Sequence, residues 1–181
     1  MGPSDLDLCR AAADGDHAAF DLLVGRHTPR LFRVALSLCG SRPDAEDLCQ
    51  ETFLAAYEGI RQFAGRSSFR TWLTAILIRR SSRAWRKRKR DSRNVTLGDG
   101  QADRGELSAG DRRLDLIDAI RSLPDEFREV VVLREMEGFS YEEIAEVMEV
   151  PCGTVQSRLH RARMILRGKL AAYRPDDGVR Q

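Results

Sequence analysis

The sequence has no long apolar run. None of its hydrophobic stretches approaches the ~20 residues that a membrane-spanning helix needs. Its first thirteen residues carry acids instead of the basic start and apolar run of a secretory signal. We therefore expect a soluble, cytoplasmic protein that does not insert into a membrane.

Cysteine and histidine are also scarce. The four cysteines, Cys9, Cys39, Cys49 and Cys152, include no CxxC pair, and none of the three histidines lies near enough to a cysteine for a zinc pattern. The thiols are interpreted as reduced and mostly packed. No glycine-rich phosphate loop and no nucleophile–base set is recognisable. These features predict no metal, no cofactor, no small-molecule substrate and no enzymatic activity.

Charge is balanced overall but segregated along the chain. Against a net charge of +2, Arg79 to Arg93 holds nine basic residues and one acid, whereas Asp44 to Glu51 holds four acids and no base. Such segregation indicates two different electrostatic surfaces. Acids in the first turns of a helix are also favourable against the helix dipole, which explains the acidic segment without any partner.

Strand signals are nearly absent, and apolar residues recur at three- and four-residue spacing, so the sequence predicts an all-α fold. A stretch rich in Gly, Asp and Ser without aromatics predicts a flexible linker between two small helical domains. The expected helices cover residues 5–26 (interrupted at Gly15), 28–39, 43–63, 69–90, a segment ending at 123, and 125–137. The expected divisions are a domain at 1–91, the linker at 92–111, a domain at 112–172 and a tail at 173–181.

A helix-turn-helix is predicted near the C-terminus. Ser140 and Glu143 form a capping-box pattern, residues 149–153 form the turn, and Val155, Leu159 and Ala162 begin the inward stripe of the second helix. The residues left outside suit phosphates and base edges in a major groove. The alternative is a solvated basic helix in an ordinary bundle. The predicted DNA-facing residues are Thr154, Gln156, Ser157, Arg158, His160, Arg161 and Arg163.

The basic run after residue 79 is preceded by Phe63, Phe69 and Trp72. Basic residues follow a phosphate backbone, and aromatic rings stack on unpaired bases. The alternatives are that the aromatics belong to the core and that the charge run is a solvated helix end. The one-signed charge favours contact with nucleic acid somewhere in this segment.

Together these segments resemble the extracytoplasmic function (ECF) sigma factors of bacteria. The strings SRPDAEDLCQETFLAAY, FAGRSSFRTWL and LPDEFREVVVLREMEGFSYEEIAEVMEVPCGTVQSRLHRARMILR carry the resemblance. It implies an N-terminal region 2 domain, a C-terminal region 4 domain and a linker that threads the polymerase. The acidic helix would dock on core RNA polymerase through Asp44, Glu46, Asp47, Gln50, Glu51 and Phe53.

The same resemblance implies that the helix-turn-helix reads the upstream, minus-thirty-five promoter element. The loop at 64–68 and the following helix would capture a flipped base of the minus-ten element, which costs a few kcal/mol to extrude. Many relatives carry Asn near Arg79 and an acid near Arg83, so the downstream preference of this chain is expected to differ or to depend more on contacts with the charged DNA backbone. The downstream, melting set is Phe63, Arg66, Ser67, Phe69, Arg70, Trp72, Arg79, Arg80 and Arg83.

The expected partners are core RNA polymerase, promoter DNA in duplex and locally melted form, and an anti-sigma factor. The alternative function is a stand-alone helix-turn-helix regulator with a helical dimerisation domain. That alternative does not account for the aromatic and basic fourth helix, because a dimeric repressor binds double-stranded half-sites.

Overall fold

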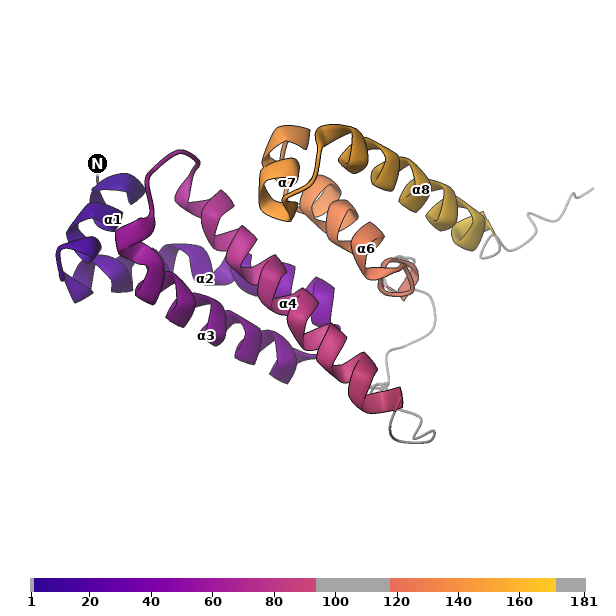
Figure 1. The fold of residues 1–181 in the computed structure, drawn as a ribbon, viewed down its shortest axis with the longest axis horizontal. Helices are drawn as coiled ribbons and strands as arrows, with labels where there is room; N and C mark the ends of the chain where they lie inside the picture. The colour runs from indigo at the N-terminus through magenta and orange to yellow at the C-terminus, as the bar shows by residue number, and fades with distance from the viewer. Residues whose placement is uncertain (1, 94–117, 172–181) are drawn as a thin grey trace, which may run out of the picture.

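The structure, a computed structural model, describes residues 2–93 and 118–171 (Figure 1). Within these ranges the chain is helical and has no strand, which confirms the predicted all-α class. Of the expected linker at 92–111, residues 92 and 93 belong to the helix that ends at Arg93, and the rest lies outside the described residues, as does the expected tail. The elements are α1 (Asp5–Ala13), α2 (His17–Cys39), α3 (Arg42–Gly59), η1 (Ile60–Gln62), α4 (Phe69–Arg93), α6 (Asp125–Val131), η2 (Val132–Met136), α7 (Tyr141–Met148) and α8 (Cys152–Ala171).

The first predicted helix is divided where the sequence indicated. Gly15 has a φ of 103°, a left-handed conformation that favours glycine, and it separates α1 from α2. Asp16 then caps α2 by accepting from the Ala19 amide at 3.2 Å. The predicted break near residue 27 is wrong, because α2 continues through Pro29 to Cys39. Proline removes one backbone donor, and packing along the whole length of α2 outweighs that loss.

Helices α2, α3 and α4 pack around the N-terminal core. Leu23, Ala35, Leu73 and Leu77 are almost fully buried, and they come from α2 and α4. α3 contributes Ala45, Leu48 and Ala56, and η1 adds Ile60. The predicted third helix is therefore an α-helix followed by a 3-10 turn, and α4 runs three residues beyond its predicted end.

The C-terminal unit contains the predicted helix-turn-helix. Ser140 caps α7 in a capping box with Glu143, as its sequence pattern predicted. Glu149 adopts a left-handed conformation with a φ of 54° and ends α7. The turn is shorter than predicted, since α8 already begins at Cys152. The helix before this motif is α6, which continues as the π-helical turn η2 and is followed by Gly138 with a φ of 69°.

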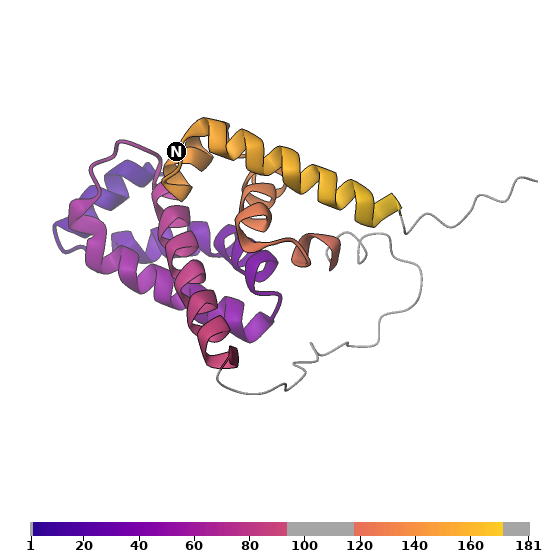
Figure 2. The ribbon, with the colours of Figure 1, turned by 45° about the vertical axis from the view of Figure 1, so that its right-hand side comes forward.

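The two units lie against each other. α7 packs on α4, and α6 and η2 pack on α2, while α8 lies at the outer side of the C-terminal unit (Figures 1 and 2). This arrangement brings the first helix of the helix-turn-helix to the segment that carries the predicted downstream residues.

Candidate nucleic-acid interface

The second helix of the helix-turn-helix, α8, has one buried and one exposed side. Val155, Leu159 and Ala162 are buried in the C-terminal core, as their spacing predicted. Leu166 and Leu170 continue this stripe but are only half-buried. Most of the remaining positions of α8 are exposed, where a duplex could reach them.

The arginines of α8 fall into two groups. Arg158 forms an ion pair with Glu126 at 3.1 Å, and its side chain is only 22% exposed. Arg163 pairs with Glu135 at 2.6 Å. The hydrogen bond and the charge of Glu135 raise the pKa of the Arg163 guanidinium. Both side chains are thus held by acids of the preceding helical segment.

A different set of α8 residues faces solvent. Gln156, Ser157, His160 and Arg161 are exposed, and their spacing of one, three and one residues places them on one side of the helix. Thr154 is half-buried, and its carbonyl accepts from the Ser157 hydroxyl at 2.9 Å. Arg167 is exposed two turns after His160. The sequence prediction omitted it, although continuing the same spacing would have found it.

The predicted aromatic residues form one cluster at the start of α4. The rings of Phe63, Phe69 and Trp72 lie with centroids 5.1 to 5.9 Å apart. Phe69 is 2% exposed and also contacts the His27 ring, so it belongs to the core. Phe63 and Trp72 are half-exposed. Only these two rings of the cluster offer a surface to an incoming base.

The loop before α4 is held close to α1. Gly65 has a φ of 67°, and a Cβ at this position would lie 3.1 Å from Leu6 Cδ1. A side chain here would therefore strain the loop and press on α1. Next to it, Arg66 is exposed and Ser67 is half-buried. The loop thus presents a cation beside the aromatic cluster.

Three predicted arginines of α4 have acidic partners. Arg70 pairs with Glu143 at 3.3 Å, and its guanidinium lies 4.1 Å from the Phe139 ring centroid. Arg79 pairs with Glu149 at 2.7 Å. The partner of Arg80 is Glu51 of α3, at 3.3 Å. Arg83 lies on α4, and its side chain is outside the described part of the chain.

The predicted polymerase-docking residues share one face of α3. Glu46, Asp47, Gln50 and Glu51 are exposed, while Asp44 and Phe53 are half-buried. Glu46 also accepts from Arg42 at 2.8 Å. The prediction missed Leu54, which is 60% exposed and follows Asp47, Gln50 and Glu51 at helical spacing. An exposed leucine among acids is a feature that a polarity pattern alone does not single out.

Residues 2–93 and 118–171 contain no group of three or more His, Cys, Asp and Glu side chains placed to hold a metal ion. No helix in these ranges combines the length and the apolar character that crossing a membrane requires.

Comparison with known families matches the two units separately. The Sigma-70 region 2 model matches residues 23–91, and the Sigma-70 region 4 model matches residues 113–166. The chain is 34% identical to the ECF RNA polymerase sigma-E factor of Haemophilus influenzae, over 92% of this chain and 95% of that protein. The chain belongs to the ECF sigma factors. The ECF sigma factor SigE of Mycolicibacterium smegmatis is 39% identical, over 94% of this chain and 71% of that protein.

Solved structures agree with this ECF sigma factor assignment. The sigma factor RpoE from Bartonella quintana, in complex with the anti-sigma factor NepR, matches with a TM-score of 0.69 at 30% identity, over 86% of this chain and 98% of that one. CnrH in complex with the cytosolic domain of CnrY matches with a TM-score of 0.70 at 28% identity, over 93% and 97%. These findings confirm the resemblance and the function as a sigma factor, and they do not favour the stand-alone regulator.

Proposed function

We propose that this sigma factor docks on core RNA polymerase through α3 and reads two promoter elements with separate domains, without catalysing a reaction itself. The observation that carries the proposal is the separation of three surfaces in one chain. They are the acidic face of α3, the aromatic and basic start of α4, and the polar outer stripe of α8. The proposed domains span 1–91 and 112–172, with 92–111 as linker and 173–181 as tail, and the proposed location is the cytoplasm.

Docking on polymerase is assigned to the exposed side of α3. Asp47, Gln50 and Glu51 would contact basic and polar groups of the polymerase, and Leu54 adds an apolar anchor between them. Large apolar side chains that become fully desolvated contribute strongly to protein interfaces, whereas rim charges mainly steer association. Asp44, Glu46 and Phe53 lie at the edges of this face.

Downstream recognition is assigned to the loop at 64–68 and the start of α4. Phe63 and Trp72 present half-exposed rings on which an unpaired base can stack, and stacking contributes about 1–3 kcal/mol per base. Phe69 supports both rings from the core. The sugar–phosphate backbone would be contacted by polar residues of the loop and by the arginines of α4. These residues are Arg66, Ser67, Arg70, Arg79, Arg80 and Arg83.

Upstream recognition is assigned to α8. Gln156, His160 and Arg161 would reach base edges, since they are exposed in the first turns of the helix. Thr154 and Ser157 would hold phosphates. Because Arg158 and Arg163 are paired with Glu126 and Glu135, we assign them to positioning α8 against α6 and η2.

An anti-sigma protein is the remaining partner that we propose. The support is that RpoE of Bartonella quintana, which matches 86% of this chain, was solved in complex with the anti-sigma factor NepR. A partner of that kind would compete with polymerase and promoter DNA for the surfaces described above.

A reconstituted transcription assay tests the proposal. The protein is mixed with core polymerase and a library of promoter fragments, and specific transcripts are sequenced. We expect transcripts that start downstream of a shared two-element promoter. Tight duplex binding without core polymerase, together with no co-purification with it, would contradict the proposal and favour a stand-alone regulator.

A further inference from the structure

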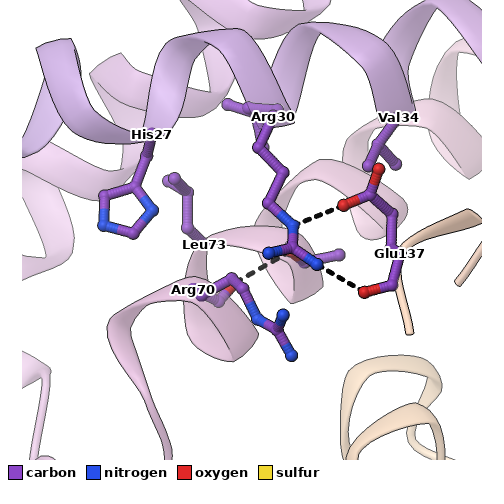
Figure 3. A pocket seen from close by; sticks show the side chains of 8 residues that line it. His27, Arg30, Val34, Arg70, Leu73 and Glu137 are labelled. Carbon is purple, nitrogen blue, oxygen red and sulfur yellow. Dashed lines mark hydrogen bonds and ion pairs between the residues drawn. The ribbon is translucent and has the colours of Figure 1, made fainter. Parts of the chain in front are cut away.

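The C-terminal domain presents three glutamates to arginines of the N-terminal domain. Glu137 accepts from Arg30 through both its carboxylate and its backbone carbonyl (Figure 3). The other two pairs, Glu143 with Arg70 at 3.3 Å and Glu149 with Arg79 at 2.7 Å, extend along α4. We call these three ion pairs the acidic clasp.

Glu137 is the most enclosed member of the acidic clasp. Its side chain is 3% exposed, and its two arginine partners, Arg30 and Arg33, both belong to α2. The neighbouring side chains His27, Leu31 and Val34 also come from α2. A carboxylate is costly to bury without a cation. The burial of Glu137 therefore depends on the N-terminal domain being in place.

A second set of contacts runs in the opposite direction. Arg128 donates to the Leu38 carbonyl at 3.2 Å, and Arg121 donates to the Gly40 carbonyl at 2.9 Å. These carbonyls lie at the C-terminal end of α2, which has no basic residue in its own last turn. Cations are favourable at this end of a helix dipole. The C-terminal domain thus supplies the capping charges that α2 lacks.

We propose that these contacts form a self-inhibited state, in which α7 occupies the basic face of α4 in place of promoter phosphates. The proposal rests on the downstream role given above to Arg70 and Arg79. A guanidinium that pairs with Glu143 or Glu149 is not available to a phosphate, and α7 packs on α4 at the side that carries Arg70 and Arg79. The outer stripe of α8 remains exposed in the same state. The closed chain therefore occupies Arg70 and Arg79 of the downstream reader and leaves the upstream reader accessible.

The acidic clasp is suited to reversible opening. The pairs of Arg70 and Arg79 are partly exposed, and exposed ion pairs are weak and are screened by salt. Both domains belong to one chain, so docking takes place at an effective concentration on the order of millimolar. Contacts that would be too weak between separate molecules suffice here. Core polymerase or DNA can then displace α7 by competing for either domain.

The first test measures compaction of the full-length chain by small-angle X-ray scattering. At about 0.05 M salt we expect a compact wild type, and at about 0.5 M salt an expanded one, because the screening length shortens. Glu137→Gln combined with Glu149→Gln should be expanded already at low salt. The matched control is Glu142→Gln with Glu146→Gln, which removes two exposed charges from α7 and should stay compact.

A charge exchange tests the pairing itself. Arg79→Glu and Glu149→Arg should each expand the chain, and the double variant should restore compaction, since the two groups are 2.7 Å apart in the closed state. Equal dimensions for the wild type and the Glu137/Glu149 variant would overturn the proposal. Compaction that increases with protein concentration would also overturn it and indicate pairing between two copies.

The second test measures binding of a single-stranded oligonucleotide that carries the downstream element found in the transcription assay. If about one fifth of the wild-type chain is open, Glu137→Gln with Glu149→Gln should bind roughly fivefold more tightly. The Glu142/Glu146 control should change less, and an equal gain in the control would overturn the proposal. Expansion of the variant with no strand binding by any protein would instead contradict the proposed function of α4 and leave the acidic clasp confirmed.

Discussion

At the scale of single residues, ion pairing separates arginines that the sequence cannot distinguish. Arg158, Arg161 and Arg163 all lie on the polar side of α8, but two of them pair with glutamates of the preceding segment. Arg161 is exposed. It is therefore the arginine of α8 best placed to read a base.

Arg161→Ala should weaken upstream promoter binding by about 1–3 kcal/mol, the range for a lost bidentate base contact. Binding to core polymerase should be unchanged. The measurement is an electrophoretic shift of holoenzyme on promoter fragments with altered upstream elements. The control is Arg163→Ala, which removes an exposed ion pair. It should weaken upstream promoter binding by less than about 1 kcal/mol. Loss of polymerase binding by Arg161→Ala would mean that the DNA-facing side of α8 is misassigned.

The thiols of Cys9 and Cys49 give a pH-dependent prediction. Burial raises the pKa of both to about 11 from an ordinary value of 9.0, and the charge of Asp5 adds to the effect at Cys9. The folded chain thus holds these protons more tightly than the unfolded chain. Their contribution to stability is fully present below pH 9 and is lost as pH rises toward 11.

Urea unfolding between pH 8 and 11 measures this contribution. The stability of the wild type should fall more steeply over this range than that of Cys9→Ala with Cys49→Ala. Tyrosine and lysine side chains titrate in both proteins, so their contribution cancels when the stability of the wild type is compared with that of the double variant. Parallel curves would contradict the burial of the two thiols.

At the scale of elements, local patterns predicted the helix-turn-helix better than the N-terminal domain. Ser140 and Glu143 are three residues apart and make the capping box that their spacing requires. The predicted break in α2 near residue 27 was wrong, because a local pattern does not include the tertiary packing of Leu31, Val34 and Ala35. The pairing of Arg70 and Arg79 with glutamates 73 and 70 positions away could not be predicted, since one sequence carries no information on how two domains dock.

The cap of α7 can be tested directly. The Ser140 hydroxyl accepts from the Glu143 amide at 3.1 Å, and the Glu143 carboxylate accepts from the Ser140 amide at 2.8 Å. Ser140→Ala should therefore destabilise the protein by about 1 kcal/mol in chemical denaturation. Ser157→Ala, in the exposed side of α8, should stay within about 0.5 kcal/mol of the wild type. Equal effects would show that the cap adds nothing beyond a lost hydroxyl.

The face of α3 gives a prediction for polymerase binding. Asp47→Lys combined with Leu54→Ala should weaken binding to core polymerase by about tenfold or more, since it removes an anchor and reverses a steering charge. The matched control is Asp21→Lys with Leu22→Ala on α2, where Leu22 is 52% exposed. Fluorescence anisotropy of the labelled sigma factor gives both affinities. A similar loss in the control would assign the effect to general charge and not to α3.

At the scale of the whole molecule, one buried arginine links the stability of the two domains. Arg128 is 7% exposed and donates to the carbonyls of Arg121 at 2.6 Å and Leu123 at 2.9 Å within its own domain. A third bond, to Leu38, crosses to α2. The same guanidinium therefore organises the start of α6 and holds that domain on its neighbour.

Arg128→Ala should reduce stability by about 2 kcal/mol, because hydrogen bonds from a charged group are lost and buried carbonyls are left without their donor. It should also divide a single low-salt calorimetric transition into two, one for each domain. Arg134→Ala is the control, since Arg134 donates to the Phe139 carbonyl and lies over the Tyr141 ring, and both partners belong to its own domain. It should lower the stability of that domain without dividing the transition. Two transitions in the wild type at low salt would mean that docking does not couple the domains, and the acidic clasp would then be too weak to hold the chain closed.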